Sequence, residues 1–156
     1  MQLEYFILID RILDLDTVAK TITVEAQVPT ASTIFEGHFP GYPLMPGVLL
    51  IESMAQTSGW LLLGLMKFER MPFLAAVKEA KMRGFVSPGE LLTIDANILH
   101  EGSGYAMTEA RVKVGGKLRC NATLTFSHIP FPSPDMRGYM VAMAKRIGFP
   151  QQVLLP

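Results

Sequence analysis

The sequence predicts an α+β fold in which one long apolar helix is wrapped by a curved antiparallel sheet. Residues 46–66 are apolar on almost every side, so this segment requires cover from the rest of the chain. Segments rich in alternating and β-branched residues lie before and after it, and Gly115-Gly116 separates two of them as a hairpin turn would. Because strands and helices do not alternate, α+β is favoured over α/β.

Composition indicates one compact domain. Of the 156 residues 49% are hydrophobic and 18% are charged, which favours a large core and suggests surface hidden in an oligomer. The 14 Lys and Arg residues balance 14 Asp and Glu residues, so no basic surface for nucleic acid is expected. The one cysteine, Cys120, lies in an alternating run and is interpreted as a core residue. With no signal-peptide pattern at the start, we expect a cytoplasmic protein.

The first third of the chain is expected to hold two strands. Residues 5–15 are mostly apolar and are predicted to begin as a short turn and continue as a strand. Residues 17–28 are predicted to form a clearer strand, with five apolar side chains mainly on one face: Val18, Ile22, Val24, Ala26 and Val28. Residues 29–37 are predicted to be a loop.

The central helix is predicted to begin near Pro46 or Gly47, because proline is tolerated in a first helical turn, and to end near Met66. Its hydrophobicity raises the possibility of a membrane span. Five polar side chains interrupt it within three turns: Glu52, Ser53, Gln56, Thr57 and Ser58. Such groups are costly in lipid, so no membrane span is expected.

The second half is predicted to form an antiparallel meander and a tail. The expected strands are a short one at residues 73–81, then 91–101, 105–114 and 117–128. Prolines at 130–134 mark a boundary between a domain at 1–129 and a linker with a tail at 130–156. Four apolar residues then recur at helical spacing: Met136, Met140, Met143 and Ile147. They predict a short helix docked on the body or on a neighbouring subunit.

Candidate chemistry gathers at the start of the central helix. His38, in a loop rich in Gly and Pro, is a candidate base, although a lone histidine is more often structural. Glu52 is a carboxylate in an apolar helix and requires a partner or a cavity; an ion pair with an arginine is the alternative. Backbone N–H groups of Gly47 and Val48 can bind a developing oxyanion. Gln56, one turn after Glu52, either orients that carboxylate or bonds to the sheet.

Other catalytic and metal motifs are absent from the sequence. There is no nucleophile elbow, dinucleotide fingerprint or phosphate-binding loop. His100 and His128 have no ligand spacing around them, so no metal is expected. The combination of a base, an acid and N–H donors therefore points to proton removal beside a carbonyl group.

Residues 37–56, GHFPGYPLMPGVLLIESMAQ, closely resemble the signature of the FabZ-type β-hydroxyacyl-(acyl carrier protein) dehydratases of the hotdog superfamily. Shorter similarities occur at residues 9–12, 35–36, 80–83 and 86–90. The resemblance covers roughly residues 5–128, which is most of the chain, and its long signature is highly specific.

The resemblance implies a hotdog fold that forms homodimers or trimers of dimers, with active sites shared between subunits. His38 would remove the C2 proton of a (3R)-3-hydroxyacyl thioester on acyl carrier protein. Glu52 of the partner subunit would help the 3-hydroxyl leave, and the Gly47 amide would bind the thioester oxygen. The product would be a trans-2-enoyl thioester in fatty acid biosynthesis or a related acyl pathway, and no cofactor is required.

The chain departs from the family pattern near the expected substrate mouth. Four residues differ in kind there, namely Tyr42, Met82, Gly84 and Phe85, and Phe39 and Pro46 are expected to lie beside them. Lys81 and Arg83 are the expected contacts for an acidic carrier protein, with ordinary solvated surface as the alternative. A hotdog acyl thioesterase and a non-catalytic acyl- or carrier-binding module are the alternative functions.

Overall fold

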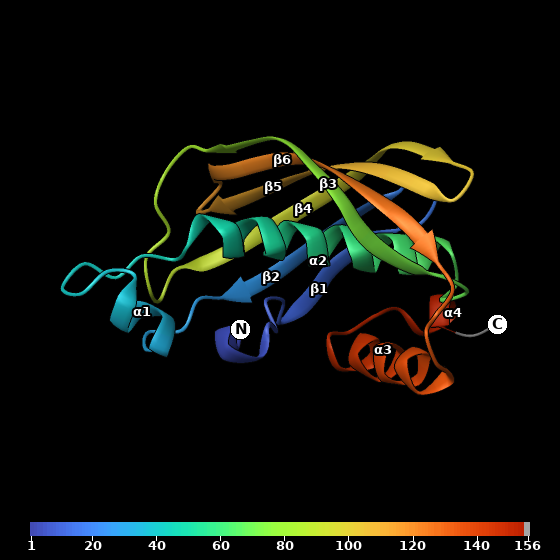
Figure 1. Ribbon diagram of the computed structural model, residues 1–156, viewed down its shortest axis with the longest axis horizontal. Coiled ribbons are helices and arrows are strands. Elements are labelled where there is room, and N and C mark those ends of the chain that lie inside the picture. The colour runs from blue at the N-terminus through green and yellow to red at the C-terminus, as the bar shows by residue number, and fades with distance from the viewer. Residues whose placement is uncertain (155–156) are drawn as a thin grey trace.

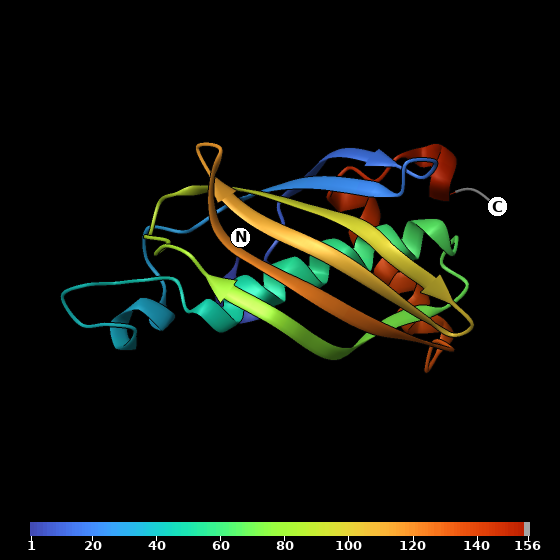
Figure 2. The same cartoon turned by 90° about the horizontal axis from the view of Figure 1, so that it is seen from above.

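The computed structural model describes residues 1–154 and has a six-stranded antiparallel sheet curved around one long helix (Figures 1 and 2). The strand order is β1-β2-β4-β5-β6-β3. The strands are β1 (Arg11–Asp16), β2 (Thr21–Gln27), β3 (Met71–Met82), β4 (Leu91–Gly102), β5 (Tyr105–Val114) and β6 (Lys117–Ile129). The helical elements are η1 (Leu3–Tyr5), α1 (Thr33–Gly37), α2 (Gly47–Leu65), α3 (Pro134–Arg146) and α4 (Gln151–Leu154). The predicted α+β architecture with an additional C-terminal helix is confirmed.

Helix α2 lies along the concave face of the sheet, and its buried side chains form the centre of the core. Its buried hydroxyls are satisfied within the fold. Ser53 Oγ donates to the Leu49 carbonyl at 2.8 Å, and Thr108 Oγ1 donates to Ser58 Oγ at 2.8 Å. Although α2 is long and apolar enough to cross a membrane, 67% of that segment is buried inside the fold. The covering sheet therefore accounts for its hydrophobicity.

Strands β4, β5 and β6 form an antiparallel meander as predicted, whereas β3 crosses over to pair with β6 and is not its first strand. Strands β5 and β6 form a hairpin in which both turn glycines have positive φ, 54° at Gly115 and 77° at Gly116, as a tight primed turn requires. Cys120 in β6 is fully buried, and burial raises the pKa of its thiol to about 11. The interpretation of Cys120 as a core residue is confirmed.

Three further sequence predictions differ from the structure. The strand predicted at 17–28 begins only at Thr21, because the Asp16 carboxylate accepts from the Val18 and Ala19 amides in a turn, and Val18 is exposed. The predicted loop at 29–37 contains helix α1, whose first turn is capped by Ser32 Oγ. Strand β3 has 12 residues and is not the short strand expected.

The C-terminal segment packs on the body of the fold below the end of α2 (Figure 1). Ser133 caps α3 by accepting from the Met136 amide, and Arg137 Nε donates to the Phe68 carbonyl at 2.8 Å. Phe149 is buried against Trp60 and Phe68, with ring centroids 6.3 and 5.4 Å away. The segment contacts the chain's own core, which is one of the two docking surfaces predicted for it.

Candidate active site

The loop between α1 and α2 holds the imidazole of His38. His38 follows the last residue of α1, and its Nδ1 lies 2.9 Å from the Leu44 carbonyl oxygen. A carbonyl only accepts, so Nδ1 carries the proton of this bond and Nε2 of the neutral ring is left as the basic nitrogen. The geometry therefore provides a base whose tautomer is set by the backbone.

Backbone hydrogen bonds hold this loop in place. The Leu44 amide donates to the His38 carbonyl at 2.8 Å, and the Met45 amide donates to the Val86 carbonyl at 2.8 Å. The Phe39 ring stacks on the imidazole with a centroid separation of 4.2 Å. These contacts restrict both the path of the chain and the plane of the His38 ring.

The start of α2 provides unused backbone donors. Pro46 occupies the N-cap position without a side-chain hydrogen bond, and the first turn has no acidic side chain. Among the described residues no acceptor is found for the N–H groups of Gly47 and Val48. Such groups, together with the helix dipole, favour a negatively charged oxygen. A Cβ at Gly47 would lie 3.3 Å from Met82 Sδ, so glycine keeps this approach open.

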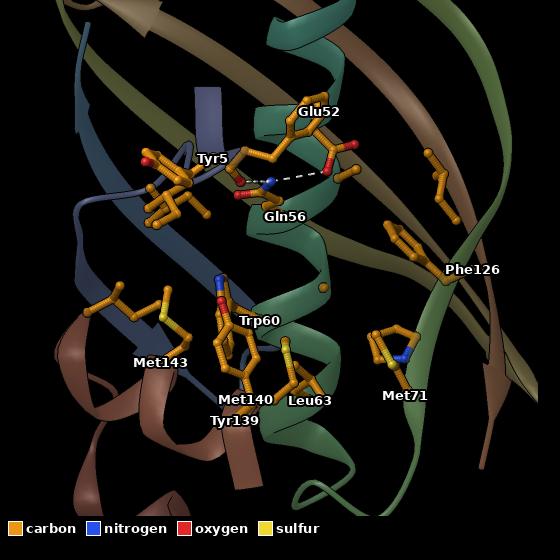
Figure 3. A pocket seen from close by; sticks show the side chains of 18 residues that line it. Tyr5, Glu52, Gln56, Trp60, Leu63, Met71, Phe126, Tyr139, Met140 and Met143 are labelled. Atoms are coloured by element: carbon orange, nitrogen blue, oxygen red, sulfur yellow. Dashed lines mark hydrogen bonds between the residues drawn. The ribbon is translucent and has the colours of Figure 1, made fainter. Parts of the chain in front are cut away.

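Glu52 and Gln56 are adjacent on the face of α2 that points away from the sheet (Figure 3). Gln56 Nε2 donates to Glu52 Oε1 at 3.1 Å and to the Phe6 carbonyl at 2.7 Å. The Leu8 amide donates to Gln56 Oε1 at 3.2 Å. The amide of Gln56 is thus oriented by the N-terminal segment, and through it the Glu52 carboxylate is oriented as well.

A cavity of about 300 Å³ runs along this face of α2. Its walls are the N-terminal segment, α2, the beginning of β3, one residue of β6, and α3 with the residue that follows it. Apart from Glu52 and Gln56 it is lined mainly by apolar and aromatic side chains: Tyr5, Phe6, Ile7, Ile9, Ala55, Trp60, Leu63, Met71, Pro72, Leu74, Phe126, Tyr139, Met140, Met143 and Ile147, with Gly59. Such a site suits an acyl chain that ends at one polar group.

The structure divides the predicted site residues into two groups. Glu52 and Gln56 line the cavity, whereas His38 does not line it within one protomer. The residues predicted at the mouth lie outside the cavity too, and four of them are exposed: Phe39, Tyr42, Met82 and Phe85. Lys81 is exposed, and Arg83 Nε donates to Asn121 Oδ1 at 2.7 Å.

The end of the cavity farthest from Glu52 was not predicted from the sequence. Trp60 lies in the predicted central helix, where its bulk fits a core position; it is buried but also lines the cavity. Tyr139 and Met140 of α3 were not predicted to belong to a site. The helical spacing of the methionines was the available signal, since it showed that α3 has an apolar face.

The two remaining histidines lie away from this cavity. The His100 ring contacts the Tyr105 ring at a centroid distance of 5.2 Å. Burial and the neighbouring Arg70 charge lower the pKa of His128. In the described part of the chain, no three His, Cys, Asp or Glu side chains are grouped as metal ligands.

The helix wrapped by an antiparallel sheet defines a protein of the hotdog class, and solved structures share this fold. A hypothetical protein from Staphylococcus aureus has a TM-score of 0.65 at 14% identity, covering 83% of this chain and 98% of that one. A conserved protein from Pseudomonas aeruginosa has a TM-score of 0.63 at 24% identity, covering 81% and 91%. A hypothetical thioesterase from Streptococcus pneumoniae, solved with coenzyme A, has a TM-score of 0.61 at 17% identity, covering 79% and 90%.

Within that class the chain belongs to the FabA-like family, because the family model for the FabA-like domain matches residues 1–123. A protein from Levilactobacillus brevis named 3-hydroxyacyl-[acyl-carrier-protein] dehydratase FabZ is 38% identical over 118 residues, which are 75% of this chain and 79% of that protein. A protein of the same name from Symbiobacterium thermophilum is 32% identical over 131 residues, 83% of this chain and 92% of that protein.

Proposed function

We propose that this chain dehydrates (3R)-3-hydroxyacyl-acyl carrier protein to trans-2-enoyl-acyl carrier protein in fatty acid biosynthesis or a related acyl pathway. The observation that carries the proposal is Glu52, a carboxylate oriented by Gln56 at the polar end of an apolar cavity. The FabZ names of the curated relatives support the same reaction. The cytoplasm, where fatty acid synthesis supplies such carriers, is the proposed location.

The reaction is a proton removal followed by loss of hydroxide as water. Nε2 of His38 takes the proton from C2, and the electron pair of the C2–H bond moves toward the thioester carbonyl. The N–H groups of Gly47 and Val48 stabilise the resulting oxyanion. Glu52 donates a proton to the 3-hydroxyl, the C3–O bond breaks, and the C2–C3 double bond forms. Proton exchange with solvent then returns His38 and Glu52 to their starting forms.

A homodimer, or a trimer of such dimers, is the proposed assembly. Strand β3 is an edge of the sheet, and four of its large apolar side chains are exposed: Phe73, Leu74, Val77 and Met82. An apolar edge strand of 12 residues is suited to pairing with a second copy. Within that dimer His38 of one subunit is proposed to meet Glu52 of the other, with Phe39, Tyr42, Pro46, Met82 and Phe85 around the mouth.

Acyl carrier protein is the proposed carrier of the substrate, and Lys81 is the better of the two predicted contacts. Its ammonium is exposed, whereas the Arg83 side chain already donates to Asn121. A lysine at the rim of the site attracts an acidic carrier through a salt-dependent interaction.

The test is the absorbance of the enoyl thioester formed from 3-hydroxyacyl carrier substrates. We expect turnover by the wild type and a fall in kcat of about 10²–10⁴-fold for either His38→Ala or Glu52→Gln, the range typical of a general acid or base. Gln56→Leu is expected to lower kcat less, because it removes the orientation of Glu52 and leaves the carboxylate in place.

The matched control is Glu36→Gln, an exposed carboxylate in the last residues of α1, which is expected to keep the wild-type rate. A thiol-trapping reagent separates the alternative, since dehydration releases no thiol and thioester hydrolysis does. Release of thiol by the wild type without enoyl product would contradict the proposed reaction.

A further inference from the structure

The cavity beside Glu52 reaches a part of the chain that the family domain does not include. The FabA-like match ends at residue 123, whereas α3 begins at Pro134. Figure 3 shows Glu52 at one end of the cavity and Tyr139, Met140 and Leu63 at the other. The wall opposite the carboxylate is therefore formed in part by a segment that lies outside the matched family domain.

Helix α3 is fixed firmly enough to serve as a wall. Ala144 and Ile147 are buried, and the Ile12 amide donates to the Ile147 carbonyl at 2.7 Å. Phe149 anchors the following residues between Trp60 and Phe68. These contacts tie α3 to β1, to α2 and to the turn after α2, so the segment has a defined position in the folded chain.

The side chains of α3 that reach the cavity are large. Tyr139, Met140 and Met143 line it from α3, next to Trp60 and Leu63 of α2. Together they line the apolar end of the cavity with ring and thioether atoms. Burial along Ala55 and Gly59 stabilises a bound saturated hydrocarbon chain. Further extension is opposed by steric overlap with the large side chains of this wall.

We propose that α3 is a chain-length determinant, in which Tyr139 and Met140 stop the acyl chain that starts beside Glu52. The inference rests on the proposed dehydratase function, and its occupant is the acyl chain of the substrate. We choose the acyl chain as the occupant because the cavity is continuous with the Glu52 carboxylate, and C3 of the substrate must lie beside that group.

The helix gives an estimate of the accepted length. At about 1.5 Å per residue, Trp60 lies roughly 12 Å along α2 from Glu52. An extended chain of single bonds advances about 1.2 Å per bond, so about ten bonds beyond C3 span this distance. Medium-length acyl chains fit, and longer ones must displace Tyr139 or Met140.

The experiment is a profile of kcat/KM against acyl chain length for the full-length wild type and four variants. Tyr139→Ala and Met140→Ala open the wall, and Gly59→Leu fills the middle of the cavity. Met136→Ala is the matched control, since Met136 also lies on α3 and is exposed but does not line the cavity. Tyr139 is exposed, so alanine there leaves the core packing intact; Met140 is half-buried against the core, so Tyr139→Ala is the primary variant.

We expect the ratio of long-chain to short-chain kcat/KM to rise about tenfold in Tyr139→Ala or Met140→Ala, the factor that burial of about two more methylenes provides. It is expected to fall in Gly59→Leu and to stay constant in Met136→Ala. Opposite shifts cannot arise from a general loss of stability. An unchanged ratio in both wall variants would overturn the proposal. If, in addition, the dimer dissociation constant changed in these variants, the cavity-lining face of α3 would be assigned to contact with the partner subunit.

Failure of the proposed function is distinguishable from failure of this inference. If the wild type turns over no chain length, calorimetric binding of unreactive saturated fatty acids of increasing length replaces the rate measurement. A longer accepted chain in Tyr139→Ala than in the wild type would then still support the wall. Equal length dependence of binding in both proteins would overturn it.

Discussion

At the scale of single residues, the orientation of Glu52 depends on atoms distant in sequence. Gln56 contacts the carboxylate from one turn away, but its own amide is held by Phe6 and Leu8. A buried or half-buried carboxylate acts on a substrate only when its oxygens have a defined position. The N-terminal segment is consequently part of the support of the site and not merely a cover for the core.

Glu4 links the same N-terminal segment to α1 and makes the fold sensitive to acid. Its carboxylate accepts from Ser32 Oγ at 2.7 Å and from the Thr33 amide at 3.0 Å. The Ser32 hydroxyl, followed by backbone N–H donors, lowers the pKa of Glu4 from 4.5 to about 2. Because the pKa is depressed in the folded state, the stabilisation is present above pH 4.5 and is lost as the pH falls toward 2.

We therefore expect the free energy of unfolding of the wild type to fall more steeply than that of Glu4→Gln between these two pH values. Urea unfolding at a series of pH values measures the difference, which should vanish near the lower limit. Glu36→Gln is the control, because Glu36 makes no side-chain hydrogen bond among the described residues and should follow the wild-type curve. Parallel curves for Glu4→Gln and the wild type would contradict the assignment.

At the scale of elements, the close contact between α2 and Phe149 predicts an unusual response of a helical glycine. Alanine normally stabilises a helix interior by about 1 kcal/mol relative to glycine. A Cβ at Gly64, however, would lie 2.9 Å from Phe149 Cζ, and that ring is held by Trp60 and Phe68. Gly64→Ala is expected to lower the free energy of unfolding by about 1–3 kcal/mol, the usual cost of overpacking.

Gly59 provides the matched comparison on the same helix. Its nearest atom to a new Cβ is Pro72 Cγ at 4.0 Å, an ordinary contact distance. Gly59→Ala is therefore expected to raise the free energy of unfolding by about 0.5–1 kcal/mol. Denaturant titration of both variants measures the contrast, and stabilisation by alanine at position 64 would show that the Phe149 ring yields at little cost.

The elements that the sequence predicted best are those with a strong local pattern. Helix α2 and strands β4, β5 and β6 have long apolar or alternating runs and were placed within one or two residues. Helix α1 has only five residues, and its Ser32 cap is supported by Glu4, which lies 28 residues away. Strand β3 is exposed along most of its length, so one-sided burial gives it no alternation.

The candidate site follows the same division. The adjacency of Glu52 and Gln56 could be predicted because residues four apart share a helix face. The contact of Gln56 with Phe6 and the lining of the cavity by α3 join segments far apart in the chain. No periodicity in the sequence encodes such contacts, and only the tertiary fold reveals them.

At the scale of the whole molecule, one protomer holds only part of the proposed machinery. The cavity contains Glu52 but not His38, and helix α1 and the loop after it project beyond the start of α2 (Figure 1). In addition, apolar side chains on the edge strand β3 are exposed to solvent in one protomer. A site shared across the proposed dimer would account for both features, since a second copy would supply the missing base and cover the edge.

Complementation between two inactive variants tests this sharing directly. A heterodimer of His38→Ala and Glu52→Gln contains one site with both changes and one site with neither, if the two residues come from different subunits. Random pairing of equal amounts is then expected to restore about one quarter of the wild-type activity, because half of the dimers are mixed and each has one intact site. Two affinity tags isolate the mixed dimers, whose dehydration rate should be about half that of the wild type. If both residues acted within one subunit, every site would keep one defect and the mixture would remain as inactive as its parents.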